Sequence, residues 1–148
     1  MINMQQRVAE KFLNSNYMFE LVYHSIAKPG ITNDEIASLL HKAREFNSAN
    51  NITGCLLHHN NEFLQILEGK KEAIQDLFLS ISKDSRHSHA YLIIEGEKKE
   101  RTFPKWSMAY NDFKVNYLSK VDSLSDTTNK PSVAIDLFYE MSRQILSK

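Results

Sequence analysis

Residues 52–69 read ITGCLLHHNNEFLQILEG, and this stretch predicts two β-strands joined by a tight turn. ITGCLLH (residues 52–58) and EFLQILE (62–68) are short, mostly apolar runs of strand length. Between them lie His59, Asn60 and Asn61, and asparagine tolerates the positive φ that tight hairpin turns require. The stretch therefore predicts a β-hairpin near the centre of a sheet.

Gln65 is the anomalous residue of this hairpin. Side chains alternate faces along a strand, so Gln65 shares a face with Phe63 and Leu67 and points where an apolar residue is expected. A buried amide left unpaired costs about 1–3 kcal/mol. We therefore expect a polar partner for Gln65 inside the fold.

A helix is predicted on each side of the hairpin. The segment from residue 31 to residue 50 has Thr32 and Glu35 at the spacing of a capping box. From Lys70 a second helix follows and stops near Asp84. Each helix has an inward stripe at helical spacing, formed by Ile36, Leu40, Ala43 and Asn47 in the first and by Ile74, Leu77, Phe78 and Ile81 in the second.

Three further strands complete the predicted sheet. FELVYHS (residues 19–25) precedes the first helix, and HAYLIIE (89–95) follows the second. A charged loop, GEKKER (96–101), leads to FPKWSMAY (103–110), an edge strand on which Trp106, Met108 and Tyr110 share a face. The order βαββαββ predicts an α+β, ferredoxin-like fold with both helices on one face of the sheet.

The two ends of the chain lie outside this unit. Residues 1–17 are predicted to be an N-terminal extension, residues 18–112 the domain, and residues 113–148 a polar linker and a C-terminal helix. That helix begins after Pro131 and is expected to cover the opposite sheet face or to join a partner. Its apolar stripe includes Leu137, Phe138 and Met141, which are the predicted contact surface for assembly.

Composition limits the classes of function. The 148 residues include 18 basic and 18 acidic side chains, a balance that argues against a general nucleic-acid or anionic-membrane binder. The single cysteine, Cys55, excludes an intramolecular disulfide and suits a reducing compartment. We expect a cytoplasmic protein with no membrane-spanning segment.

Several polar and aromatic residues are predicted to converge around Gln65. They are Tyr23, Asn47, Trp106 and Met108. Taken singly, each has an ordinary structural explanation: a core tyrosine, a helix C-cap, and core filling. Together they form a polar cluster beneath two helices, which a small core does not need.

Other reactive side chains give weaker signals. The pairs His58-His59 and His87/His89 do not have the spacing of known metal sites, so we predict no metal. Cys55 lies in an apolar strand and is expected to be an inert, buried thiol.

The ordered blocks LVYHS, FNSANNITGCLLH, FLQILEG, KDSRHSHA and FPKWSMAY resemble the BLUF domain, a flavin-binding sensor of blue light. The resemblance runs from about Phe19 to Asn111. It implies a flavin ring held between the two helices, with FAD as the expected cofactor and FMN or riboflavin as alternatives. The sequence departs from some family members at Phe46 and Ser80, where polar and basic residues also occur.

The resemblance also implies a role for each matching residue. Tyr23 corresponds to the donor of an electron and a proton to the excited flavin, and Gln65 to the hydrogen-bond switch. The other flavin-binding positions are Asn47, Asp84, Arg86, His87 and Met108, and the positions linked to signalling are Trp106 and Met108.

The function implied is that of a photoreceptor that is not itself an enzyme. Its output would pass to an unknown downstream signalling protein, and it would form a homo-oligomer. Two alternatives remain at this point: a small ferredoxin-like enzyme of the acylphosphatase type, and an RNA-binding sheet surface.

Overall fold

The computed structural model describes residues 3, 18–85, 87–112, 128 and 130–146. The predicted N-terminal extension, residues 1–17 apart from residue 3, and most of the predicted linker, residues 113–127, lie outside this description. Eight elements follow one another along the described chain. They are β1 (Met18–Ala27), α2 (Asn33–Ala49), β2 (Thr53–His59), β3 (Glu62–Gly69), α3 (Lys71–Ser82), β4 (His87–Lys98), β5 (Ala109–Asp112) and α4 (Pro131–Leu146).

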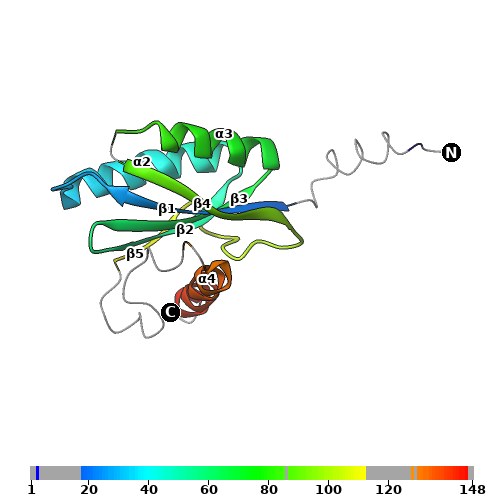
Figure 1. Ribbon diagram of the computed structural model, residues 1–148. Helices are drawn as coiled ribbons and strands as arrows, with labels where there is room; N and C mark the ends of the chain where they lie inside the picture. Colours follow the sequence, from blue (N-terminus) through cyan, green and yellow to red (C-terminus); the bar gives the residue numbers. More distant parts are fainter. Residues whose placement is uncertain (1–2, 4–17, 86, 113–127, 129, 147–148) are drawn as a thin grey trace.

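The sheet has five strands in the order β4-β1-β3-β2-β5. The first four strands are antiparallel to their neighbours, and β5 runs parallel to β2 at one edge. This order confirms the α+β, ferredoxin-like prediction. Figure 1 shows α2 and α3 on one face of the sheet and α4 on the other.

The predicted hairpin of β2 and β3 is present, with a turn built on asparagine. Asn60 and Asn61 have φ values of 47° and 65°, the left-handed pair that a two-residue turn needs between twisted strands. Gly54 on β2 allows a close approach, because a Cβ at this position would collide with the backbone oxygen of Ile66 on β3. The glycine of the ITG block is therefore required by strand packing.

The capping box of α2 is also confirmed. Thr32 Oγ1 accepts a hydrogen bond from the backbone N–H of Glu35 at 3.1 Å, and the Glu35 carboxylate accepts one from the backbone N–H of Thr32. These two bonds satisfy amide donors that the first turn leaves unpaired. They fix where α2 begins, and hence which residues its final turn presents to the sheet.

Two apolar cores lie on opposite faces of the sheet. The core beneath α2 and α3 contains Tyr23, Leu40, Phe63, Leu67 and Ile74. The core beneath α4 contains Val22, Cys55, Leu57, Leu64, Ile66, Phe103, Leu137, Phe138 and Met141. Both faces of the sheet are thus covered, which contradicts the alternative of an exposed RNA-binding sheet surface.

The expectation that the α4 stripe mediates assembly is wrong. Leu137, Phe138 and Met141 are buried against the protein's own sheet. An apolar stripe on a helix specifies that it packs, and the partner here is the sheet face that the other two helices leave open (Figure 1).

The predicted last strand, residues 103–110, is mostly not a strand. Regular pairing begins at Ala109, and the preceding residues turn. Pro104 has no amide to donate, and the amide of Trp106 donates back to the carbonyl oxygen of Phe103 at 3.4 Å. A backbone hydrogen bond still ties these residues to β2, from the amide of Gly54 to the carbonyl oxygen of Trp106 at 3.1 Å.

The predicted charged loop at residues 96–101 is wrong in its first half. Strand β4 continues to Lys98, which pairs with Met18 of β1. Lys98 is held in place because its ammonium bonds the carboxylates of Glu20 and Glu68.

None of the helices that the structure describes is long and apolar enough to cross a membrane.

Candidate functional site

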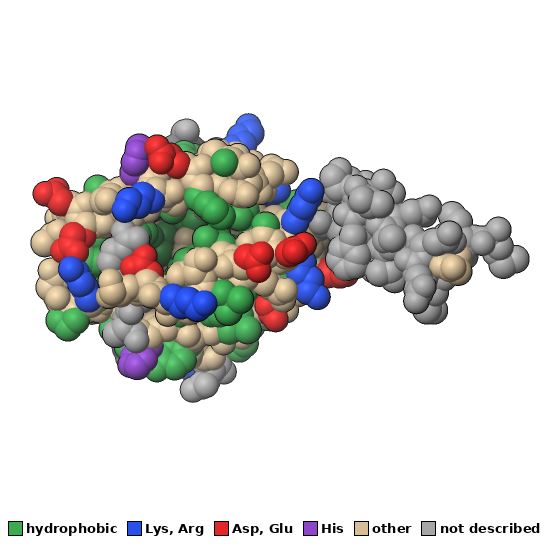
Figure 2. Space-filling view, turned by 90° about the horizontal axis from the view of Figure 1, so that it is seen from above, with side chains coloured by type: hydrophobic (Ala, Val, Ile, Leu, Met, Phe, Trp, Pro, Cys, Tyr) green, Lys and Arg blue, Asp and Glu red, His purple; other side chains and the backbone are tan. Residues whose placement is uncertain are grey.

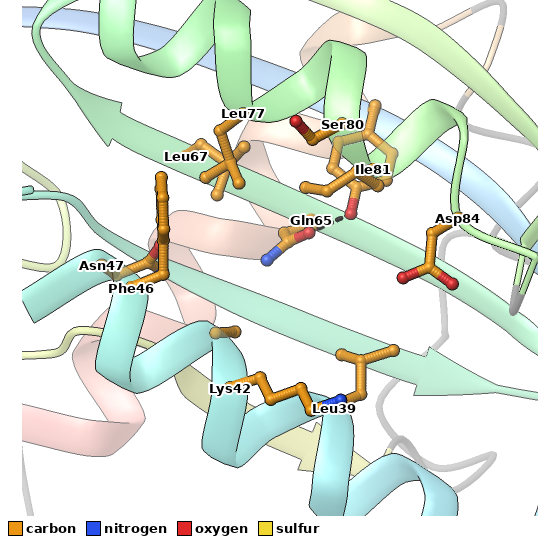
Figure 3. A pocket seen from close by; sticks show the side chains of 12 residues that line it. Leu39, Lys42, Phe46, Asn47, Gln65, Leu67, Leu77, Ser80, Ile81 and Asp84 are labelled. Carbon is orange, nitrogen blue, oxygen red and sulfur yellow. Dashed lines mark hydrogen bonds between the residues drawn. The ribbon is translucent and has the colours of Figure 1, made fainter.

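A cavity of about 200 Å³ lies between α2 and α3, above the centre of the sheet. Figure 2 shows it as a hollow with hydrophobic side chains inside, and Figure 3 shows the side chains that line it. Its walls are mostly apolar, and its polar groups come from both helices and the sheet. The lining residues are Tyr23, Leu39, Lys42, Ala43, Phe46, Asn47, Gln65, Leu67, Leu77, Ser80, Ile81 and Asp84.

Gln65 and Tyr23 form a hydrogen-bonded pair on the floor of this cavity. The antiparallel register of β1 and β3 places them directly opposite each other. The Tyr23 hydroxyl donates to Gln65 Oε1, and Gln65 Nε2 donates to the sulfur of Met108 at 3.2 Å. The side chains of Tyr23 and Gln65 are buried, with 1% and 4% of their surface exposed, respectively. The polar partners that Gln65 needs are therefore a hydroxyl at one end of its amide and a thioether at the other.

The Tyr23 hydroxyl is held in its protonated form. Burial raises its pKa well above the ordinary value, and the nearby carboxylate of Asp84 raises it further. The phenol ring packs at 5.3 Å from the ring of Phe78 on α3. Tyr23 is thus a fixed, neutral hydrogen-bond donor.

Asn47 occupies the last turn of α2 and is buried at 1% exposure. Its Nδ2 donates to the carbonyl oxygen of Ser107 at 2.7 Å. Its Oδ1 is buried without a hydrogen-bond partner among the residues that the structure describes. Buried acceptors are usually satisfied, so this carbonyl at the cavity wall is free to accept a hydrogen bond from a group bound there.

Met108 and Trp106 differ in position, although both were predicted to share one face of a strand. Met108 is buried at 1% exposure, in contact with Gln65. Trp106 is 42% exposed and does not line the cavity. They differ because the chain turns between Phe103 and Met108, so strand alternation does not apply there.

Of the three site residues predicted just after α3, which are Asp84, Arg86 and His87, the structure describes the side chain of Asp84. Asp84 lies at one end of the cavity (Figure 3). Arg86 lies outside the described residues. His87 is the first residue of β4, and its side chain is not among those described.

Sequence reasoning missed several residues that line the cavity. Leu39, Lys42 and Phe46 come from α2, at spacings of three and four. These spacings place them on one stripe beside the inward stripe, which is the signal that could have found them. Leu77 and Ile81 were predicted to be core residues, and they are partly buried because they face the cavity.

A family model described as BLUF, sensors of blue-light using FAD, matches residues 18–109. The chain belongs to the BLUF family. Its matched residues are those of a flavin-binding photoreceptor domain and not of an enzyme. The family match therefore does not support the acylphosphatase alternative.

Relatives of this BLUF chain include subunits of photoactivated adenylate cyclases from Euglena gracilis. The beta subunit is 34% identical over 89 residues, which is 60% of this chain and 10% of the relative. An alpha-like protein is 41% identical over 70 residues, or 47% of this chain and 7% of the relative. The alignment thus spans about a tenth of the length of the curated relatives.

Solved structures of similar shape include a BLUF protein and other light-responsive proteins. The dark state of BlrB has a TM-score of 0.75 at 25% identity and covers 88% of this chain and 98% of that one. The photo-activated state of BlsA has a TM-score of 0.72 at 28% identity, covering 84% and 93%. A bacterial light-regulated adenylyl cyclase has a TM-score of 0.63 at 27% identity, covering 88% of this chain and 36% of the cyclase.

Proposed function

We propose that this protein senses blue light through a flavin held between α2 and α3, and that Tyr23 and Gln65 convert absorption into a changed hydrogen-bond network. One observation carries the proposal. On the cavity floor, the two ends of the Gln65 amide bond two different partners, the Tyr23 hydroxyl and the Met108 sulfur. A reversal of that amide changes both contacts at once.

The residues present fit a flavin. The unpaired Asn47 Oδ1 matches an N–H on the polar edge of the ring, and the apolar side chains of Leu39, Phe46, Leu77 and Ile81 suit its flat faces. Lys42, Ser80 and Asp84 supply polar groups for the flavin's side chain, and Arg86 and His87 remain predicted contacts. We propose FAD as the cofactor, with FMN and riboflavin as alternatives that extraction and chromatography distinguish.

A bound flavin supplies the absorption of blue light and, once excited, an electron acceptor. With a flavin bound, Tyr23 would give it an electron, and the Tyr23 hydroxyl proton, which points at Gln65 Oε1, would pass to that oxygen as Gln65 Nε2 releases one of its own protons to the flavin. The electron and the proton would then return to Tyr23, which leaves no net redox change. Burial keeps the phenol neutral beforehand, which is what makes a proton available to move with the electron.

Gln65 is suited to the switch because its amide has a donor at one end and an acceptor at the other. Rotation or tautomerisation reverses these ends. Nε2 then no longer donates to Met108, and Met108 is released from its dark-state contact. A glutamate would bring a negative charge, and a leucine has neither a hydrogen-bond donor nor an acceptor to exchange.

We further infer that the output passes through α4 to a downstream signalling protein in the cytoplasm. The relatives that are subunits of photoactivated adenylate cyclases, and the solved structure of Klebsiella pneumoniae BlrP1 with FMN and cyclic diGMP, support this class of output. We also propose a homo-oligomer. Size-exclusion chromatography in darkness and under blue light tests this, and a protein that is monomeric in both would contradict it.

The decisive experiment is a visible spectrum of the flavin-loaded protein before and after blue light. We expect a small red shift of the flavin band that reverses in darkness. Replacing Gln65→Leu should abolish the shift while flavin stays bound. The matched control is Gln75→Leu on α3, which does not line the cavity and should keep the shift. A loaded protein with no reversible shift would overturn the proposal.

A further inference from the structure

Glu68 is a fully buried carboxylate three residues after Gln65 on β3. Strand alternation places it on the opposite sheet face, the side of Leu64 and Ile66 that α4 covers. A buried charge is costly unless it is paired and hydrogen-bonded. Glu68 is paired with a cation and is also hydrogen-bonded, and these partners show which segment of the chain its carboxylate binds.

The carboxylate of Glu68 binds the start of the segment that joins β4 to β5. Its Oε2 accepts from the backbone N–H of Thr102 at 2.6 Å, and its Oε1 from the N–H of Phe103 at 2.8 Å. The ammonium of Lys98 neutralises it. Arg101 adds a second tie, since its guanidinium donates to the Glu68 carbonyl oxygen at 3.0 Å.

Residues 101–108, here called the joining segment, reach both faces of the sheet. At its start, the Phe103 ring packs edge-on against the ring of Phe138 on α4, with 6.3 Å between centroids. Both rings are 1% exposed. A displacement of Phe103 therefore cannot occur without a response from α4, because close-packed rings leave no free space between them.

At its end, the joining segment enters the candidate flavin site. Asn47 Nδ2 donates to the Ser107 carbonyl oxygen, and Arg44 Nε donates to the Met108 carbonyl oxygen at 3.1 Å. The Met108 sulfur accepts from Gln65 Nε2. One stretch of eight residues thus contacts the switch at one end and α4 at the other.

We propose that Glu68 is a positioning residue that anchors the joining segment, so that a change at Gln65 is transmitted to α4. This inference rests on the light-sensing function proposed above. When Gln65 Nε2 leaves Met108, the Met108 side chain is released, while Glu68 still couples the backbone of residues 102 and 103 to β3. The joining segment then moves as one unit and carries the change to the contact of Phe103 with Phe138, whereas a loose loop would absorb it.

The anchor requires a carboxylate. Two backbone N–H groups point at Glu68, and each of its two oxygens accepts one of these backbone bonds, while Oε1 also accepts from Thr53 Oγ1 at 3.4 Å and Oε2 pairs with the Lys98 ammonium. A glutamine has one oxygen, so it leaves one of these donors unsatisfied. The variant Glu68→Gln therefore loosens the start of the segment while leaving every residue of the flavin cavity in place.

The test compares the loaded parent protein with Glu68→Gln and with the control Glu20→Gln. Glu20 also pairs with Lys98, at 2.9 Å, but no bond from Glu20 reaches the backbone of the joining segment. Three signals are measured in darkness and under blue light. They are the flavin band, the fluorescence of Trp106, which is the protein's single tryptophan, and hydrogen exchange of residues 131–146.

In the parent and in Glu20→Gln, we expect the reversible red shift together with a light–dark difference in Trp106 fluorescence and in α4 exchange. Glu68→Gln should keep the red shift and lose both differences. Its amides at positions 102 and 103 should also exchange about tenfold faster in darkness. A merely structural role would speed exchange equally in both conditions, and the light–dark difference would survive.

The outcomes separate this inference from the proposed function. No red shift in the parent overturns the proposed function. A red shift in the parent without an α4 difference, or an α4 difference that persists in Glu68→Gln, overturns the inference alone. Should Glu68→Gln not fold, Phe138→Leu tests the other end of the path. It removes the ring that meets Phe103, and it should keep the red shift but lose the α4 difference; an undiminished difference would refute the inference.

Discussion

Replacing Asn47→Leu should separate flavin binding from folding. The two side chains have the same branching and the same number of heavy atoms, although leucine is larger, so the shape of this buried site is largely kept. In the flavin-free protein, the change removes the 2.7 Å bond to the Ser107 carbonyl oxygen and also removes the unpaired Oδ1. These effects oppose each other, and we expect the free energy of unfolding to change by no more than about 1 kcal/mol.

Flavin affinity should fall much more. The leucine cannot accept the N–H of the ring edge, and burying that donor without a partner costs about 1–3 kcal/mol. The dissociation constant should therefore rise about 5- to 150-fold. Titration of the flavin-free protein, followed by flavin fluorescence, measures the affinity. Urea unfolding of the same samples measures the stability.

The matched control is Asn50→Leu. Asn50 follows α2, and its exposed Nδ2 bonds the Phe46 carbonyl oxygen at 2.8 Å, away from the cavity. Its substitution should leave flavin affinity unchanged. The reasoning fails if Asn47→Leu changes the affinity by less than about twofold, or if it unfolds the flavin-free protein.

Three further changes test the fold and the site. Gly54→Ala places a Cβ against the Ile66 carbonyl oxygen and should destabilise the protein by about 1–3 kcal/mol or more in urea, whereas Gly96→Ala, where a Cβ meets nothing within 4 Å, should be close to neutral; equal effects would contradict the close approach. Phe138→Ala should cost about 3–5 kcal/mol of stability, and a loss below about 1 kcal/mol would mean that α4 is not packed on the sheet. The raised pKa of Tyr23 means that it stays protonated when the unfolded chain ionises near pH 10, so the free energy of unfolding should fall as pH rises through that range; Tyr23→Phe should reduce this slope, which urea unfolding from pH 8 to about 11 measures.

The predictions that succeeded depend on local periodicity. Strand alternation placed Gln65 and Tyr23 on strand faces that were expected to converge, and the structure pairs them. Helical spacing placed Asn47 on the inward stripe of α2, where it is buried. These results follow because the direction of a side chain within a strand or helix is set by neighbouring residues.

The predictions that failed concern irregular chain and the choice of partner. Residues 103–110 were expected to alternate as a strand, yet Pro104 and the turn at Trp106 break the pattern. The start of this stretch is bound by a side chain of β3, because the Phe103 N–H donates to the carboxylate of Glu68. The apolar stripe of α4 was expected to cover the opposite sheet face or to join a partner; the first expectation is confirmed, and the expectation that Leu137, Phe138 and Met141 mediate assembly is wrong.

The sequence by itself determined the order of the elements, the hairpin with its asparagine turn, and the need of Gln65 for a polar partner. The tertiary structure alone decided which end of the amide meets each partner, Oε1 the Tyr23 hydroxyl and Nε2 the Met108 sulfur, and that Asn47 keeps an unpaired carbonyl at the cavity wall. The physical reason is that periodicity is encoded by adjacent residues, whereas contacts across more than 40 positions, such as those of Gln65, exist only once the sheet and helices have packed.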